Sequence, residues 1–354
     1  MTMQRSVDAS DVLLEQVRHA LDRQTPLYIQ GGGSKAFLGR QVEAELLDTR
    51  IHRGIVSYDP TELVITARAG TALSEVLAVL DEAGQMLTCE PPYAPVGATL
   101  GGMLAAGLSG PRRPWAGAVR DLVLGTRLIT GQGKHLRFGG EVMKNVAGYD
   151  LSRLLAGSFG CLGVITEVSL KVLPKPRHRL SLSLHLDAVT ALRKLAEWGQ
   201  QPIPLSAACH DDEQLHLRLE GGEGSVAAAA ERLGGEVLDD GYWDDLNQQR
   251  LAFFAEPQAL WRVSLPNNTG VLALPGSQLI DWGGAQRWLK SEADAGQIRQ
   301  LVSAHGGHAS CFSAGHCDSP FQPLSAALLR YHRQLKAQLD PQGIFNRGRL
   351  YAEV

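Results

Sequence analysis

The chain has 354 residues, which is too long for one ordinary hydrophobic core and predicts two domains. Its apolar content of 44% is typical of a globular protein, and its formal net charge of −3 gives no electrostatic reason to bind nucleic acid or an anionic membrane. The first residues lack the apolar run of a secretory signal, and no window approaches the roughly 18 apolar residues of a membrane span, so we expect a cytoplasmic protein. Five cysteines, mostly far apart, favour free thiols over a disulfide framework.

The first predicted elements lead into a glycine-rich turn. An amphipathic helix is predicted over residues 10–22 with Ser10 as its cap, and a short strand over 26–30 follows. The strand runs into the turn Gly31–Lys35, where consecutive backbone N–H groups can cradle a phosphate. The turn matches neither a Walker loop nor a dinucleotide-binding fingerprint, so an ordinary glycine-rich turn explains it about equally well.

A second cluster of small residues follows further along the chain. Strands are predicted over 53–58 and 62–69, and a helix over 71–83. The run Pro91–Gly110 is then almost all Gly, Ala, Ser and Thr around a few aliphatic residues. A tightly packed small-residue helix explains such a run, and so does backbone that a dinucleotide approaches closely. The dinucleotide is the better interpretation beside the Gly31–Lys35 turn, because two phosphates need two sets of donors.

The most informative stretch is Val142–Pro174, which comes after a predicted hairpin of strands Leu122–Thr130 and His135–Phe138. Its middle, 157–163, places three glycines among small residues, and Val164–Val172 then alternates like a half-buried strand. A glycine-punctuated loop that feeds a strand lets a flat ligand lie against bare backbone, because no Cβ stands in the way. We expect the ligand to be FAD.

The proline-rich segment Pro174–Arg177 marks a domain boundary. Beyond it, strands alternate with helices and hairpins, which indicates an antiparallel sheet with helices on one face. The predicted strands of this part are 180–186, 203–209, 214–220, 259–265, 270–274, 278–282 and 308–313, and its predicted helices are one capped by Asp187 and those near 225–233 and 291–304.

The chain is predicted to end in a helix over 324–339 and a tail over 344–350. We therefore expect an FAD-binding domain over 1–176, a cap domain on the substrate side over 177–323, and a C-terminal helix and tail over 324–354 that return to the FAD-binding domain.

Four stretches together resemble one family: the glycine turn, Pro95–Gly110, Lys144–Pro174 and Asp340–Leu350. They resemble the FAD-binding flavoproteins of the vanillyl-alcohol oxidase and p-cresol methylhydroxylase type, and within them the FAD-binding E subunits of bacterial glycolate oxidase. The sequence KNVAGYDL from Lys144, followed by GSFGCLGVITE from Gly157, carries the resemblance most specifically. It implies an α+β fold, with an FAD-binding domain of two subdomains and a cap of antiparallel sheet and helices.

The resemblance also implies how FAD is held. The turn and the Pro95–Gly102 segment would hold the pyrophosphate from two sides, and Ser109 and Gly110 would lie near the flavin. Some relatives attach the flavin covalently through a histidine in the first phosphate loop, and Gly31–Arg40 has none, so we expect non-covalent FAD. The residues expected to contact FAD are Gly31, Gly32, Gly33, Ser34, Lys35, Pro95, Val96, Gly97, Ala98, Thr99, Gly101, Gly102, Ser109, Gly110, Gly157, Ser158, Gly160, Cys161, Gly163, Val164 and Ile165.

The resemblance implies partners as well. Glycolate, a 2-hydroxy acid, would be oxidised to glyoxylate, and electrons would pass through flavin in a complex with a larger FAD-binding subunit and an iron–sulfur subunit. We expect no nucleic-acid partner, and a place in the cytoplasm or at the inner face of the cell membrane through the partner subunits. The larger subunits carry a His-x-Gly-Asp-Gly-Asn-x-His run that binds a metal and orients the hydroxy acid. Here the nearest sequence is His305-Gly-Gly-His308, which lacks the carboxylate and the spacing.

Three interpretations of the His305–Cys317 segment stay open. Two histidines and two cysteines can bind zinc, but their spacings fit no common zinc pattern, so no metal site is expected. A packing histidine is the second interpretation. The third is that His308 faces the flavin as a proton acceptor or polar wall, which makes it the candidate catalytic residue.

Oxidation of a hydroxy acid also needs a cation for the carboxylate. The candidates for that cation are Arg112, Arg113, Arg120 and Arg349. Because the metal-binding run is missing, three roles remain for the chain as a whole. It is a subunit whose flavin relays electrons, a self-sufficient FAD-dependent 2-hydroxy-acid dehydrogenase, or a flavin-free scaffold.

Overall fold

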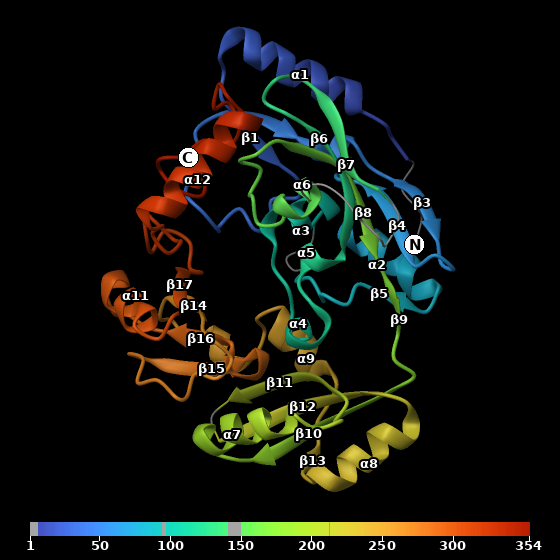
Figure 1. Ribbon diagram of the computed structural model, residues 1–354, viewed down its shortest axis with the longest axis vertical. Coiled ribbons are helices and arrows are strands. Elements are labelled where there is room, and N and C mark those ends of the chain that lie inside the picture. The colour runs from blue at the N-terminus through green and yellow to red at the C-terminus, as the bar shows by residue number, and fades with distance from the viewer. Residues whose placement is uncertain (1–5, 94–96, 141–149, 212) are drawn as a thin grey trace. The chain divides into compact units, whose positions relative to one another are not determined.

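The computed structural model describes residues 6–93, 97–140, 150–211 and 213–354 (Figure 1). They fall into two compact units. Unit 1 comprises residues 1–108, 118–174 and 323–354, and unit 2 comprises 109–117 and 175–322. The segment 109–117, which we expected in the first domain, thus lies in unit 2. In the part of the chain that the structure describes, no helix is long and apolar enough to cross a membrane.

Unit 1 is built on a five-stranded antiparallel sheet in the order β3-β4-β8-β6-β7, and β1 and β2 form a separate parallel pair (Figure 1). The predicted hairpin is confirmed, because β6 pairs with β7. The strands are β1 Leu27–Gln30, β2 Glu45–Asp48, β3 Ile55–Asp59, β4 Val64–Arg68, β5 Gln85–Met86, β6 Val123–Ile129, β7 His135–Gly139, β8 Val164–Lys171 and β9 Leu173–Pro174. The helices are α1 Ser10–Arg23, α2 Leu73–Glu82, α3 Leu100–Ala106, α5 Val119–Leu122, α6 Leu151–Leu154, α12 Ala326–Leu339 and the 3-10 turn η1 Thr49–Ile51.

Strand β8 lies in the middle of the unit 1 sheet and is buried on both faces, so the prediction of a half-buried strand was wrong. Its apolar residues pack in a core with α2 and α3. Its hydroxyl residues are buried too, because each has a hydrogen-bond partner: Ser169 pairs with Thr66 at 2.8 Å, and Thr166 with the His135 ring at 2.8 Å. Paired hydroxyl groups tolerate burial, which alternation alone did not reveal.

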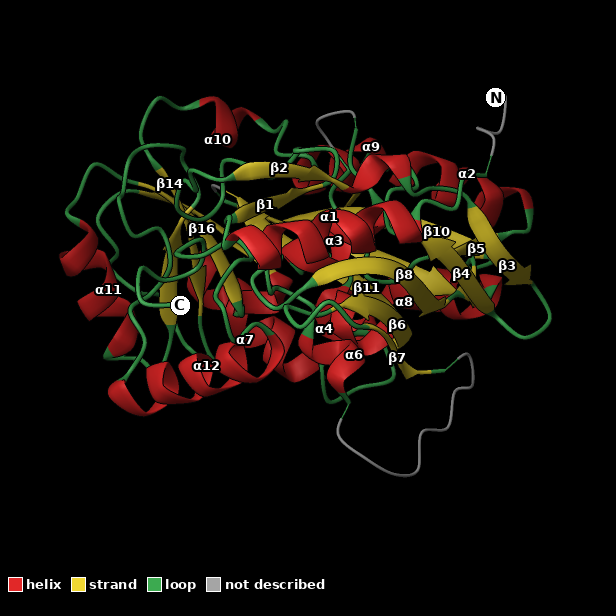
Figure 2. Ribbon diagram, turned by 90° about the horizontal axis from the view of Figure 1, so that it is seen from above, coloured by secondary structure: helices red, strands yellow, loops and turns green. Residues whose placement is uncertain are grey.

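Helix α1 packs its apolar residues Leu13 and Val17 against β1, β2 and the tail residue Phe345, and Figure 2 shows it beside β1. The expected cap at Ser10 was wrong. Ser10 is the first residue of the helix, and its own N–H donates to the Asp8 carboxylate at 3.0 Å.

Unit 2 is built on an eight-stranded sheet in the order β13-β10-β12-β11-β15-β16-β14-β17, with all pairs antiparallel. The strands are β10 His178–His185, β11 Leu205–Asp211, β12 Gln214–Gly221, β13 Glu236–Val237, β14 Leu260–Ser264, β15 Ser277–Asp281, β16 Gln286–Lys290 and β17 His308–Cys311. The helices are α4 Arg113–Ala116, α7 Ala188–Trp198, α8 Glu223–Leu233, α9 Gly241–Asn247, α10 Ala252–Ala255, α11 Ala295–Ser303 and the 3-10 turn η2 Trp282–Gly284.

The two faces of the unit 2 sheet differ in chemistry. Leucines of β10 and β12 pack with α7 and α8 on one face, and residues of β14 and β17 pack with α11 on that face. Asp187 caps α7 as predicted, accepting the N–H of Thr190 at 3.0 Å. The opposite face carries polar and charged side chains, such as Arg218 and Glu220 on β12 and Arg262 on β14.

One predicted strand of unit 2 was wrong, and two strands were missed, the two-residue β13 and the longer β16. Residues 270–274 are irregular, because their backbone bonds are local: Leu274 N–H donates to Leu272 and Gly276 N–H to Leu274. Strand β16 was missed because its sequence, QRWLK, is mostly polar. All of its residues are buried, since it lies between β15 and β14.

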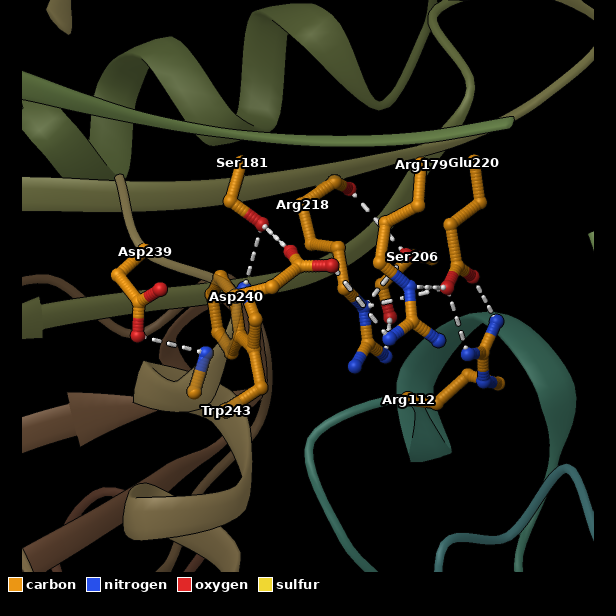
Figure 3. Close-up of polar contacts among 10 residues, drawn as sticks. Arg112, Arg179, Ser181, Ser206, Arg218, Glu220, Asp239, Asp240 and Trp243 are labelled. Atoms are coloured by element: carbon orange, nitrogen blue, oxygen red, sulfur yellow. Dashed lines mark hydrogen bonds and ion pairs between the residues drawn. The ribbon is translucent and has the colours of Figure 1, made fainter. Parts of the chain in front are cut away.

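Residues 109–117 belong to unit 2 because their polar groups bind there. Arg112 forms a bidentate ion pair with Glu220 of β12, with Nη2 donating to Oε1 at 2.8 Å (Figure 3). The indole of Trp282 donates to the carbonyl of Gly110 at 3.0 Å. The side chains of Arg112 and Glu220 are only 7% and 4% exposed. Nothing in the local sequence pointed to a partner 108 positions away.

Candidate functional site

Unit 1 contains a cavity that opens to solvent, with an empty volume of about 750 Å³. Four segments far apart in sequence line it. They are β1 with the turn that follows it, α3, the loop that leads into β8 with the first part of that strand, and the tail after α12; Thr49 and Ala69 complete the lining.

The turn after β1 offers hydrogen-bond donors to the cavity. Gly33 has a φ of +70°, and a Cβ on Gly32 would overlap the carbonyl oxygen of Gly97, so both positions need glycine. Within the described ranges, the N–H groups of Gly32, Gly33 and Ser34 have no hydrogen-bond partner. Beside them lies Lys35, whose pKa is lowered by burial. Such a row of free amides next to a lysine suits a phosphate.

Helix α3 presents its first turn to the cavity. Thr99 caps the helix by accepting the N–H of Gly102 at 3.2 Å. Gly101 lets the helix approach β4 closely, since a Cβ there would lie 2.6 Å from the Cβ of Ala69. A Cβ on Gly31 would in turn overlap the Thr99 hydroxyl. These glycines therefore bring protein segments together, which gives them a role in the fold besides admitting a ligand.

The loop before β8 is bonded to α3. Phe159 N–H donates to the Ala105 carbonyl at 2.9 Å, and Gly157 N–H donates to the Leu104 carbonyl at 3.0 Å. Gly160 and Gly163 have φ angles of +73° and +153°, a region that favours glycine. The glycine punctuation of this loop is thus needed for its backbone path.

The C-terminal tail closes the cavity through Asn346 and Arg349. Asn346 accepts the Ile29 N–H at 2.7 Å and donates to the Phe159 carbonyl at 2.6 Å. Arg349 donates to the carbonyls of Ala36 and Arg40, at 2.7 and 2.6 Å. The tail thereby holds the glycine turn and the loop before β8 in one arrangement.

The structure places the predicted FAD contacts in several environments. Ala98 lines a smaller adjoining cavity of about 260 Å³ with Ser34 and Lys35, and Gly97 lies against Gly32. Ser158, Cys161 and Val164 are buried in the wall, Gly157 does not line the cavity, and Ser109 and Gly110 lie in unit 2. Pro95 and Val96 are outside the described residues. The predicted residues that line the main cavity are Gly31, Gly32, Gly33, Ser34, Lys35, Thr99, Gly101, Gly102, Gly160, Gly163 and Ile165.

Sequence reasoning missed the remaining lining residues. Ala105 and Ala106 lay within a run that the sequence had marked, and Asn346 and Arg349 lay in the tail that carried part of the resemblance, so a signal existed for these four. Tyr28, Ile29 and Gln30 are strand residues whose neighbours only the fold determines. The full set of missed residues is Tyr28, Ile29, Gln30, Ala36, Thr49, Ala69, Ala105, Ala106, Phe159, Asn346 and Arg349.

The candidates for substrate chemistry are divided between the two units. His308 is exposed on β17 of unit 2, whereas Arg349 lines the cavity of unit 1. Arg112 is paired with Glu220, and the Arg113 guanidinium lies 4.5 Å from the centre of the Trp282 ring. Arg120, also in unit 1, is exposed beside Asp121. In the part of the chain that the structure covers, no group of three or more His, Cys, Asp or Glu could hold a metal ion.

The residues that line the cavity suit FAD by their chemistry. Free N–H groups and Lys35 suit the pyrophosphate, while Ala69, Ala105 and Ile165 provide a small, apolar wall for a flat ring. The glycines that line the cavity leave the backbone accessible without a side chain.

The comparisons with known proteins agree with this assignment. The FAD binding domain family matches residues 7–139. Over 352 residues the chain is 61% identical to the glycolate oxidase subunit GlcE of Escherichia coli K12, covering 99% of this chain and 100% of that protein. The glycolate oxidase subunit GlcD of Bacillus subtilis is 33% identical over 38% of this chain and 29% of its own length. The structure of p-cresol methylhydroxylase with substrate bound matches with a TM-score of 0.73 at 14% identity, covering 98% of this chain and 88% of that one.

The chain is therefore a member of the FAD-dependent oxidoreductases that act on CH–OH donors, and its cofactor is FAD. Within that class it belongs to the GlcE family of glycolate oxidase subunits. The predicted α+β fold of the p-cresol methylhydroxylase type is confirmed.

Proposed function

We propose that the chain is the FAD-binding subunit of a glycolate oxidase complex, which oxidises glycolate to glyoxylate and passes electrons through flavin to an iron–sulfur subunit. One observation carries the proposal: the 61% identity to the Escherichia coli subunit extends over 99% of this chain, so it includes unit 2 as well as the FAD cavity. A cavity for FAD alone would support only a flavoprotein, because many activities share this fold.

The chemistry divides between FAD and the protein. Oxidation of glycolate to glyoxylate removes two electrons and two protons, and FAD, when bound, accepts two electrons. The protein holds the cofactor with the amides of the Gly31–Lys35 turn and with the loop before β8. A hydroxy acid needs further groups for its carboxylate and its hydroxyl proton.

We propose that a larger FAD-binding subunit and an iron–sulfur subunit are the partners. The chain has no His-x-Gly-Asp-Gly-Asn-x-His run, so we assign orientation of the hydroxy acid by a metal to the larger subunit. We place the complex in the cytoplasm, at the inner face of the cell membrane through those partners. Fractionation of cells with and without the partner genes tests the location.

The function is tested by expressing the chain alone and together with both partner subunits. We expect two flavin absorption bands in the purified chain, and after acid precipitation the colour should move to the supernatant, since no histidine of the turn can hold FAD covalently. Glycolate should reduce an artificial electron acceptor only when the partners are present. A colourless chain that refuses added FAD would support the scaffold role and contradict the proposal.

A second candidate is a self-sufficient FAD-dependent 2-hydroxy-acid dehydrogenase. It is favoured by a cation and a histidine, Arg262 and His308, on the polar sheet face of unit 2. Glycolate-dependent reduction of the acceptor by the isolated chain, at the rate of the complex, would establish it over the first proposal.

A further inference from the structure

Strands β14 and β17 carry polar side chains on one face of the unit 2 sheet. Arg262 pairs with Ser310, and Ser264 pairs with His308, so these four side chains share one face. The alternate residues of the same strands, such as Trp261, are packed in the core with α11. The core therefore does not use the polar face of these strands.

Arg262 is held in a fixed orientation. Its Nε donates to the Gln286 side chain at 2.6 Å, and Gln286 donates to Asp281 at 3.0 Å. The guanidinium also lies 5.1 Å from the centre of the Trp282 ring, a cation–π contact. A guanidinium held by neighbours before a ligand arrives loses less entropy on binding.

The charge of Arg262 is not neutralised by an ion pair. Among the residues that the structure describes, no carboxylate lies within ion-pair distance of Arg262, and its two terminal nitrogens donate no hydrogen bond. Asp281, the acidic residue nearby, accepts from the Trp282 N–H at 2.6 Å and from Gln286. Burial and the charge of Arg113 lower the pKa of Arg262 to about 10, so it remains charged at neutral pH.

His308 lies on the neighbouring strand, diagonal to Arg262. The surrounding protein and the charge of Arg262 both lower its pKa, so the imidazole is neutral at pH 7. A neutral imidazole accepts a hydrogen bond or a proton from a hydroxyl group. A guanidinium with two free terminal nitrogens binds a carboxylate through parallel hydrogen bonds.

We propose that Arg262 and His308 form a binding site in unit 2 for a small 2-hydroxy carboxylate. Arg262 binds the carboxylate, and His308 accepts the hydroxyl hydrogen. This inference rests on the proposed function for the identity of the acid, and it assigns substrate recognition to this chain as well as to the larger subunit. Two other arginines are unsuitable, because Arg112 is neutralised by Glu220 and Arg287 is completely buried.

Binding to the full-length, FAD-loaded chain tests the site, with glycolate as the probe in isothermal titration calorimetry. Replacing Arg262 by Gln should weaken glycolate binding by about ten- to a hundredfold, the range expected for losing hydrogen bonds to a charged group, and R262K should recover part of it. The control is R250Q, because Arg250 is a surface arginine of the same unit paired with Asp244 and Asp245, and it should bind as the wild type does.

Two further ligands separate the roles of the two residues. Glycolamide lacks the carboxylate, so it should bind neither the wild-type chain nor the R262Q variant. H308A should weaken the binding of glycolate more than the binding of acetate, because acetate has no hydroxyl group. Thermal melting of each variant establishes that it is folded. A wild-type chain that does not bind glycolate, or a folded R262Q chain that binds it as tightly as the wild type, overturns the inference.

Failure of the inference is distinguishable from failure of the proposed function. If the complex with R262Q oxidises glycolate with an unchanged KM, the site is wrong and the proposed function stands. If the wild-type complex does not oxidise glycolate, the proposed function itself is wrong. A raised KM with kcat little changed supports a binding role for Arg262.

Discussion

The side chain of Asn346 accepts the backbone N–H of Ile29 at 2.7 Å, although the two residues are 317 positions apart. Its amide nitrogen donates to the Phe159 carbonyl at 2.6 Å. One side chain near the end of the protein thus joins β1, the loop before β8 and the tail, and all three border the FAD cavity. The cavity depends on the last residues of the chain, because they fix the distance between segments that come from its first half.

Replacing Asn346 should therefore weaken FAD retention. In N346D the acceptor for Ile29 remains while the donor to Phe159 is lost, so we expect weaker FAD binding, by about tenfold, and a modest loss of stability. N346A loses both hydrogen bonds, so it should bind FAD more weakly than N346D and should be less stable. Fluorescence titration with FAD measures the affinity. The control is N268A, because Asn268 is exposed in unit 2. FAD affinity unchanged in N346A would contradict the joining role.

Gly32→Ala should lower both stability and FAD retention, because the new Cβ would overlap the Gly97 carbonyl oxygen. We expect a loss of about 1–3 kcal/mol, as for other forced overpacking. The matched control is G224A in α8, where a Cβ meets nothing within 4 Å and alanine favours the helix. Urea denaturation with and without FAD measures both effects. If G32A is as stable as the wild type, the close approach of the turn at Gly32 to the segment at Gly97 is wrong.

The buried ion pair of Arg112 and Glu220 should contribute more to the stability of the fold than the partly exposed Arg179, which also contacts Glu220. Burial alone would raise the pKa of Glu220, but the hydrogen bond from Arg112 and the charges of Arg218, Arg112 and Arg179 outweigh it and bring the pKa to about 2. E220Q removes the carboxylate that three buried or half-buried arginines share, so it should cost about 3 kcal/mol. R112M should cost less, because Glu220 keeps Arg179 at 2.8 Å and Arg218 at 3.6 Å. R179Q, whose side chain is 37% exposed, should cost less than about 1 kcal/mol.

A double-mutant cycle separates the pair from its surroundings. The double variant R112M/E220Q should be more stable than the sum of the single losses predicts, since the Arg112 charge that E220Q leaves without its carboxylate is removed as well. Additive losses in denaturant unfolding would show that Arg112 and Glu220 do not interact.

His52 should make stability depend on pH in the mildly acidic range. Its Nδ1 accepts the Ala9 N–H at 3.0 Å, and burial, with the nearby charge of Arg68, lowers its pKa to about 4 although Asp8 opposes the change. The folded protein therefore favours neutral His52, and this contribution is fully present above the unfolded pKa of about 6.5. It is lost as the pH falls from about 6.5 to about 4.

The variant H52N tests this dependence, because asparagine can accept the same N–H and does not titrate. We expect the difference in Tm between the wild type and H52N to shift in favour of H52N as the pH is lowered from 7 to 4. The comparison cancels the contribution of His135, whose pKa burial also lowers. A difference that is constant over this range would refute the assignment to His52.

The sequence by itself determined the class of fold, the cofactor and most segments of the cavity. Glycine turns, the run around α3 and the loop before β8 are local patterns, since each reflects backbone geometry that only a few residue types adopt. The hairpin of β6 and β7 and the cap of α7 at Asp187 were likewise predictable, because neighbouring residues form them.

Only the tertiary structure decided which distant groups meet. In the folded chain the polar strand β16 is buried between β15 and β14, Arg112 pairs with Glu220, and Asn346 bonds to Ile29. The tertiary structure also showed that the glycines at 31, 32 and 101 bring protein segments together, a packing role that the sequence had left open beside ligand binding. The physical reason is that a buried polar group is stabilised by its partner, and the partner is chosen by the folded chain and not by the neighbouring sequence.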